Sequence, residues 1–180
     1  MSEYKLGEVI MPREVIAKRV KELADQIAKD LNKQEVLVVG ILTGASLFLT
    51  DLVREMPEDM DVRIDFMSVS SYMQDTTTSG VVRILHDIKT SIEGKNVVVV
   101  EDIIDSGLTL NYLLKLLQSR KPASLKTCVL LDKPSRRKTE VKVDYVGFEI
   151  PDEFVVGYGL DYAGKWRHLK DIRNVNVVEI

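Results

Sequence analysis

The 180-residue sequence contains few of the residues that form disulfides or zinc sites: one cysteine, Cys128, and two histidines, His86 and His168. One thiol cannot form an internal disulfide, and Cys128 lies in the apolar run 127–131, which predicts a buried core residue. Two histidines far apart in the sequence supply too few ligands for zinc. Thiol catalysis is not expected either, because no base is recognisable near Cys128.

The sequence also lacks the features of membrane proteins and of nucleic-acid-binding proteins. No apolar stretch approaches the ~20 residues of a membrane helix, and residues 1–5 lack the basic and apolar parts of a signal peptide. The net charge of −3 provides no basic excess for binding nucleic acid. We therefore predict a cytoplasmic globular protein with no membrane partner and no nucleic-acid partner.

The first half of the chain alternates between helical and strand patterns. Pro12 suits the first turn of a helix that reaches to about Leu31, with apolar residues at spacings of three and four. Residues 36–42 form a continuous apolar run rich in β-branched residues, typical of a strand covered on both faces. A turn of small residues and a helix to about Met56 follow, and residues 62–69 predict another strand.

The second half continues this alternation. Strands are predicted at 81–85, 97–100, 125–131 and 145–150, with a helix at 108–119. The pattern favours an α/β fold with a mainly parallel sheet flanked by helices. We expect a single domain, 1–180, with a core at about 34–150. A small irregular cap is expected from 151–180 together with the N-terminal segment.

Acidic residues follow the all-valine strand 97–100. Glu101 and Asp102 come directly after it, and Asp105 follows three residues later. Ligands of open parallel sheets bind beyond the carboxyl ends of the strands, which is where these acids are predicted to lie. Carboxylates there can hold a divalent cation or accept hydrogen bonds from ribose hydroxyls.

The next residues have the character of a phosphate-binding loop. Ser106 and Gly107 can expose backbone N–H groups, and a helix N-terminus follows at Leu108 and Thr109. A Walker motif and a dinucleotide fingerprint are both absent. In the structural alternative, Asp105 or Ser106 only caps the helix and the acid pair is a solvated strand end. The combination of all these features favours a ligand site.

Residues 97–109 resemble the phosphoribosyl pyrophosphate signature of the type I phosphoribosyltransferases. Further segments resemble the hypoxanthine-guanine branch of that family, in its order. The resemblance spans roughly residues 36–167 and implies the type I phosphoribosyltransferase fold with a small hood. It implies transfer of a 5-phosphoribosyl group from phosphoribosyl pyrophosphate to hypoxanthine or guanine.

Two segments resemble the family's pyrophosphate-binding loop and its mobile catalytic loop. The first is Leu42, Thr43 and Gly44, which implies pyrophosphate binding through backbone N–H groups; its first peptide bond can be cis in the family. Thr43 stands where the mammalian form has lysine, so a side-chain role is not implied there. The second, starting at Ser71 and Tyr72, resembles the mobile catalytic loop, which excludes water from a reactive sugar cation.

The resemblance also assigns residues to the purine. The resemblance implies that Lys133 donates a hydrogen bond to the 6-oxo oxygen, which would discriminate against adenine. It also implies that Phe154 stacks on the base and that the Val155 backbone contacts the edge of the base. Asp161 corresponds to an acid near a second metal, and Arg167 to a pyrophosphate-binding arginine.

The catalytic roles implied by the resemblance centre on Asp105, as a general base for the purine N7 proton. Glu101 and Asp102 hold ribose hydroxyls directly or through Mg²⁺, the implied cofactor, with Asp161 as a further metal ligand. The loop 105–109 anchors the 5′-phosphate. A homodimer or homotetramer is usual for the family.

Two other functions fit parts of the sequence. A phosphoribosyltransferase-like regulator that senses nucleotide and binds RNA or DNA is one, but the acidic composition and the intact loop at 71–80 disfavour it. A receiver-like phosphorylation domain is the other, but its acids come from several strands, whereas Glu101, Asp102 and Asp105 follow a single one.

Overall fold

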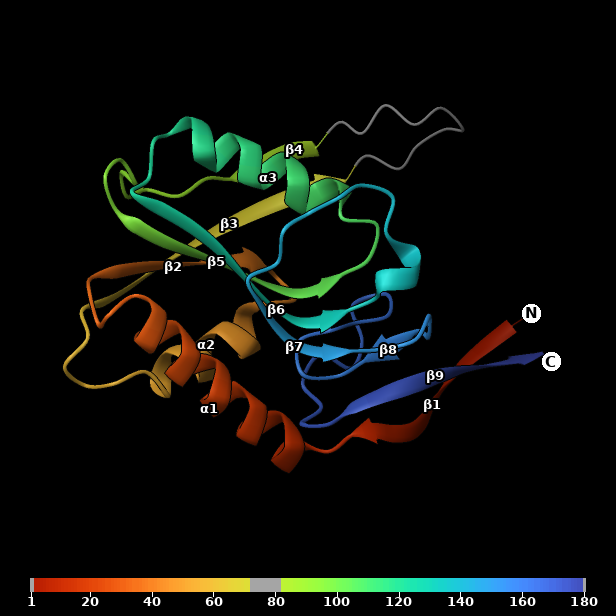
Figure 1. Ribbon diagram of the computed structural model, residues 1–180. Helices are drawn as coiled ribbons and strands as arrows, with labels where there is room; N and C mark the ends of the chain where they lie inside the picture. The colour runs from red at the N-terminus through yellow and green to blue at the C-terminus, as the bar shows by residue number, and fades with distance from the viewer. Residues whose placement is uncertain (1, 72–81, 180) are drawn as a thin grey trace.

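The computed structural model describes residues 2–71 and 82–179 (Figure 1). Its core is a six-stranded sheet in the order β4-β3-β2-β5-β6-β7. The strands are β2 (Val36–Leu42), β3 (Val62–Ser71), β4 (Val82–His86), β5 (Asn96–Ile104), β6 (Ser124–Asp132) and β7 (Tyr145–Glu149). All neighbours pair in parallel except β3 and β4, which are antiparallel. The predicted fold class is confirmed.

Helices cover both faces of the sheet, which explains why the central strands are apolar throughout. α1 (Arg13–Asp30) and α2 (Ser46–Arg54) lie on one face and α3 (Leu108–Ser119) on the other (Figure 1). Alternate residues of β5 face the two layers: Val98 and Val100 pack with α1 and α2, whereas Val97 and Val99 pack with α3. A strand buried on both faces has no polar side, so the valine run at 97–100 follows from its central position.

A second, smaller sheet forms the cap. It contains β1 (Ser2–Met11), β9 (Ile172–Glu179) and β8 (Val155–Val156), in the order β1-β9-β8 and antiparallel throughout. The N-terminal segment thus contributes a strand that the sequence analysis did not predict. The expectation of an irregular region after Pro151 is wrong for residues 172–179, which form a regular strand once β1 is available as a partner.

Most predicted elements are confirmed within a few residues, and their differences have simple causes. α1 starts at Arg13 because Pro12 is its N-cap residue, and α2 ends at Arg54, two residues before the predicted Met56. Cys128 is fully buried, as predicted, and this burial raises the pKa of its thiol. No helix among the described residues is long and apolar enough to cross a membrane.

Candidate active site

The predicted site residues gather where β2, β5 and β6 end. Because these strands are parallel, the segments that follow them leave the same edge of the sheet. These segments are the loop at 42–45, the loop at 105–107 and the turn that begins at Lys133. The cap sheet with β8 lies beside this edge (Figure 1). The position agrees with the general location of ligand sites in open parallel sheets.

The acid pair lies inside β5, not after its end as predicted from the sequence. The strand continues to Ile104, since Glu101 and Ile104 still pair with Val129 and Asp132 of β6. The prediction that the strand ends at residue 100 is therefore wrong. Strand pairing uses the backbone groups, so the ladder with β6 continues through the acidic residues. Glu101 and Asp102 are both half-buried.

Burial controls the protonation of this pair. It raises the pKa of Glu101 well above its usual value, and the neighbouring charge of Asp102 adds to the effect. Burial also raises the pKa of Asp102, although the charge of Arg167 partly opposes this shift. The Asp102 N–H donates to Glu101 Oε1 at 3.2 Å, and the Ile103 N–H to Asp102 Oδ1 at 2.8 Å. Two adjacent, half-buried carboxylates of this kind attract a cation.

Two glycines bring three walls of the site into contact: the acid pair, the 42–45 loop and the cap segment that contains Gly159. A Cβ atom on Gly44 would lie 1.7 Å from Asp102 Oδ2, so the carboxylate packs directly on the backbone of the 42–45 loop. A Cβ atom on Gly159, where φ is +98°, would lie 2.1 Å from the Gly44 carbonyl oxygen. Only glycine fits at either position. The acid pair, the 42–45 loop and the cap segment therefore meet at Gly44.

The 42–45 loop presents backbone donors at this meeting point. The Leu42–Thr43 peptide bond is cis. The N–H groups of Thr43 and Gly44 have no acceptor within residues 2–71 and 82–179. Thr43 instead accepts, through its carbonyl oxygen, a bond from the Ser46 hydroxyl at 2.8 Å. The loop thus offers amides, and not a side-chain charge, to an anion.

The loop after β5 forms the predicted anion cradle at the start of α3. Gly107 is the N-cap residue, with a left-handed φ of 79° and no side-chain cap. The structural alternative, in which Asp105 or Ser106 caps the helix, is therefore wrong. Among the described residues, no acceptor binds the N–H groups of Ser106 and Gly107, and the Leu108 N–H reaches Ser106 Oγ only at 3.4 Å. Amides at a helix N-terminus suit a phosphate group.

A basic segment that the sequence analysis overlooked supports this cradle. The Ser106 carbonyl oxygen accepts bonds from the N–H groups of Lys138 and Thr139, at 2.9 and 3.3 Å. Arg137 donates to the Asp105 carbonyl oxygen at 2.9 Å and also binds the Asp132 carboxylate. The run Arg136-Arg137-Lys138 after a strand end was the available signal.

Asp105, the predicted base, is held at the mouth of the site by Arg136. The Arg136 Nε donates to Asp105 Oδ1 at 3.1 Å, and its Nη1 lies 3.5 Å from Asp152 Oδ2. These side chains are about half exposed. The Asp105 carboxylate therefore remains accessible to a ligand.

Lys133 is the least exposed cation of the site. Only 7% of the residue is exposed, and its ammonium group lies 3.8 Å from Asp152 Oδ1, beyond hydrogen-bond distance. Its own N–H donates to the Ile104 carbonyl oxygen at 3.0 Å, which fixes Lys133 to the end of β5. A nearly buried donor without a short bond favours a ligand acceptor.

The cap contributes an exposed aromatic ring. Phe154 is 52% exposed, and its ring lies edge-on to Tyr162 at 5.5 Å. The Tyr162 ring is tilted against Tyr4 of β1, with 4.1 Å between the ring centroids, and stacks on Trp166 at 6.3 Å. Val155 is buried in β8, where it pairs with Asn174. The open face of Phe154 can accept a planar ring.

Arg167 and Asp161 bind each other. The Arg167 Nη2 lies 2.7 Å from Asp161 Oδ1, and its Nη1 donates to the Gly159 carbonyl oxygen at 2.6 Å. Asp161 Oδ2 accepts the Gly164 N–H at 2.6 Å. Asp161 therefore holds Arg167 in place, and its role as a metal ligand stays a prediction.

The described residues contain no cluster of three or more metal-ligating side chains of the His, Cys, Asp and Glu types. Magnesium sites commonly need only one or two carboxylates when phosphate oxygens complete the coordination. Glu101 and Asp102 fit that requirement. The predicted closing loop lies outside the described residues from Tyr72 onward, and Ser71 is the last residue of β3.

Comparisons with known proteins agree with this geometry. The model of the phosphoribosyl transferase domain family matches residues 10–163. Hypoxanthine-guanine phosphoribosyltransferase of Bacillus subtilis is 47% identical over 169 residues, which cover 94% of this chain and 93% of the relative. The enzyme of the same name from Dictyostelium discoideum is 51% identical over 164 residues, covering 90% and 91%.

A crystal structure of a hypoxanthine-guanine phosphoribosyltransferase from Bacillus anthracis has a TM-score of 0.91 at 47% identity. The superposition covers 97% of this chain and 99% of that one. The acid pair, the cradle at 105–109 and the cap thus occur in a fold that is shared almost entirely. The chain belongs to the phosphoribosyl transferase family.

Proposed function

We propose that this protein transfers the 5-phosphoribosyl group from phosphoribosyl pyrophosphate to hypoxanthine or guanine, giving IMP or GMP and pyrophosphate. The observation that carries the proposal is the contact of three walls at Gly44. At this contact the 42–45 loop with its free amides adjoins both the acid pair and the cap segment. The relatives quoted above are named for the same reaction, so we do not retain the regulatory or the receiver-like alternative.

The sugar-phosphate end of the substrate fits the cradle after β5. The free amides of Ser106 and Gly107, with the Thr109 hydroxyl, bind the 5′-phosphate at the positive end of α3. Glu101 and Asp102 accept the ribose hydroxyls and favour positive charge on the ring. Fixing both ends of the sugar positions its anomeric carbon for the base.

The pyrophosphate end fits the opposite wall. The amides of Thr43 and Gly44 and the guanidinium of Arg167 are the donors there. Mg²⁺, when bound at Glu101 and Asp102, neutralises charge on the leaving pyrophosphate. Burial raises the pKa values of both carboxylates, and a nearby cation favours their ionised form.

The purine fits between the cap and the turn after β6. Phe154 stacks on its face, the Val155 backbone binds its edge, and the Lys133 ammonium donates to the 6-oxo oxygen. Adenine carries an amino group there, which would leave the nearly buried Lys133 without an acceptor. Lys133 is therefore the residue that selects 6-oxopurines.

Asp105 acts as the general base. Its carboxylate takes the N7 proton as N9 attacks the anomeric carbon, and the pyrophosphate leaves from the other side of the sugar. Arg136 binds Oδ1 of this carboxylate at 3.1 Å, so Oδ2 can accept the proton of the purine. We also propose a cytoplasmic enzyme that works as a homodimer or homotetramer, as the family resemblance implies.

Incubation with phosphoribosyl pyrophosphate, Mg²⁺ and each nucleobase separately tests the function, with the nucleotides identified by mass. We expect IMP and GMP, and no AMP. Formation of AMP at a similar rate would remove the role of Lys133, and no nucleotide with any base would overturn the proposal. Omission of Mg²⁺ in a parallel reaction tests the cofactor.

A further inference from the structure

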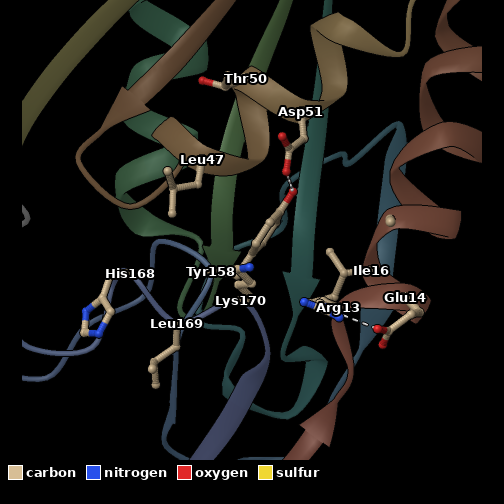
Figure 2. Close-up of a pocket in the computed structure, with 11 residues that line it drawn as sticks. Arg13, Glu14, Ile16, Leu47, Thr50, Asp51, Tyr158, His168, Leu169 and Lys170 are labelled. Carbon is tan, nitrogen blue, oxygen red and sulfur yellow. Dashed lines mark hydrogen bonds and ion pairs between the residues drawn. The ribbon is translucent and has the colours of Figure 1, made fainter.

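A pocket of about 470 Å³ lies between α1, α2 and the cap segment 158–170. Tyr158 crosses this space, and Figure 2 shows its hydroxyl reaching Asp51 on α2. The Tyr158 hydroxyl donates to Asp51 Oδ2 at 2.6 Å, although the two residues are 107 positions apart. The bond therefore joins the cap to α2 across the pocket.

The backbone of Tyr158 is fixed directly to the segment that carries Arg167. Its N–H donates to the Leu169 carbonyl oxygen at 2.8 Å, and the Gly159 N–H donates to the Arg167 carbonyl oxygen at 2.9 Å. Tyr158 has a left-handed φ of 50°, between two glycines of positive φ. It is buried, so its side chain has little freedom to leave Asp51.

The other end of the bond is fixed to the 42–45 loop. Asp51 lies on α2, which begins at Ser46, directly after that loop. The Ala45 carbonyl oxygen accepts the Leu49 N–H at 2.8 Å, so loop and helix share one hydrogen-bonded turn. No cation pairs with Asp51 in the described part of the chain, which leaves the Tyr158 hydroxyl as the side-chain partner of its carboxylate.

We infer that the Tyr158–Asp51 hydrogen bond is a positioning contact for the pyrophosphate subsite. The inference rests on the proposed function and adds two residues to it. The donors to pyrophosphate come from two segments, the amides at 43–44 and the guanidinium of Arg167, and this bond sets the spacing between them. Neither Tyr158 nor Asp51 touches the substrate itself.

The contact predicts a specific kinetic signature. Loss of the bond allows α2 and the cap to move apart, so the two sets of donors no longer fit one pyrophosphate. The ribose phosphate and the purine bind elsewhere, to the cradle at 105–109 and to Lys133 and Phe154. Only ligands that contain pyrophosphate should therefore bind more weakly.

The test measures Tyr158→Phe beside the wild-type protein. We expect KM for phosphoribosyl pyrophosphate to rise about five- to tenfold. A lost hydrogen bond to a carboxylate can cost more than this, but only part of the effect reaches the donors to pyrophosphate. KM for hypoxanthine should change by less than about twofold. In direct titration, pyrophosphate with Mg²⁺ should bind more weakly by the same factor, while GMP binding stays unchanged.

The matched control is Tyr145→Phe. The Tyr145 hydroxyl donates to Asp30 Oδ2 at 2.8 Å and is also buried, but it joins α1 to β7 at the far end of the sheet. Both variants remove one tyrosine hydroxyl from a carboxylate, but Asp30 keeps Lys126 at 3.5 Å, so Tyr145→Phe should lower the melting temperature by no more than Tyr158→Phe. Only Tyr158→Phe should change KM for phosphoribosyl pyrophosphate.

Asp51 supplies a rescue test. Asp51→Asn keeps an oxygen that accepts the Tyr158 hydroxyl and should leave KM within about twofold of the wild-type value, whereas Asp51→Ala should behave like Tyr158→Phe. Equal KM changes in the two tyrosine variants, or an unchanged KM in Tyr158→Phe, would overturn the inference. An inactive wild-type protein would overturn the proposed function instead, and the pyrophosphate and GMP titrations would still test the contact.

Discussion

Two regions of the central sheet hold their carboxylates in opposite ways. Directly after the edge strand β4, Asp87 binds Arg120 through two bonds of 2.9 and 2.6 Å, and this arginine lowers the pKa of Asp87. At the carboxyl end, burial raises the pKa of Glu101 and Asp102. Acids of the first kind stabilise the fold. Ionised acids of the second kind destabilise the folded protein, and a bound ligand can relieve this destabilisation.

Acids at the amino end of the sheet repeat the stabilising pattern of Asp87. Tyr145 lowers the pKa of Asp30, and Lys33 lowers the pKa of Asp59. Sequence alone would not separate these acids from the pair in β5, because all of them lie near the ends of apolar elements. Their partners distinguish them: hydroxyls and cations at one end, a second carboxylate at the other.

The largest effect is expected for Asp105→Asn. An amide cannot take the N7 proton, so turnover should fall by about 10²–10⁴-fold, the usual contribution of a general base. Phosphoribosyl pyrophosphate should still bind, because the backbone amides of the cradle are unchanged. Single-turnover kinetics and ligand titration measure the two quantities. Unchanged turnover would remove Asp105 as the base.

A smaller, substrate-selective effect is expected for Lys133→Ala. The variant loses the donor to the 6-oxo oxygen, so kcat/KM for hypoxanthine and guanine should fall by about 100-fold. Binding of ribose 5-phosphate should not change, since the cradle lies on another loop. An equal loss in both measurements would contradict the assignment of Lys133 to the base.

Glu101→Gln should stabilise the fold while it weakens catalysis. Burial raises the folded pKa of Glu101, so the ionised carboxylate opposes folding above that pKa, and the penalty disappears below the ordinary carboxyl pKa. The variant should therefore gain about 1 kcal/mol at pH 8 and little at pH 4. Thermal unfolding at the two pH values measures this. Glu149→Gln, an exposed acid at the end of β7, serves as the control and should show no gain.

Asp87→Asn should have the opposite sign and the smallest effect. Arg120 lowers the folded pKa of Asp87, so its stabilisation is present above the ordinary carboxyl pKa and is lost as the pH falls through the lowered value. The pair is partly exposed, so solvent screening limits the loss to about 1 kcal/mol or less at pH 7. Urea unfolding at pH 7 and pH 3 tests it. A double substitution with Arg120→Gln should add no further loss.

Much of the core could be predicted because burial leaves a clear pattern in the sequence. The stripe of α1 and the valine run of β5 mark elements that are covered on one and on both faces. The strand β1 left no such mark, since Tyr4, Leu6 and Val9 are more than a third exposed and pair with residues at the other end of the chain. Pairing over that distance is set by tertiary structure and not by local pattern.

The candidate site could be located from Glu101 to Thr109, but its supporting contacts could not. The sequence indicated acids and a cradle, and the family resemblance assigned Lys133 and Arg167. Nothing local indicated that Arg136 binds Asp105, or that Tyr158 reaches Asp51. Such contacts join segments tens of residues apart, and only the packed fold brings them together.

The pairing of β1 with β9 has a consequence for the order in which the two sheets can form. β1 precedes and β9 follows all the other described strands, and β8 joins the cap sheet through β9. The strands of the central sheet can pair with one another without either of them. The cap sheet therefore cannot be completed until residues 172–179 have been synthesised, whereas the central sheet needs no residue beyond β7.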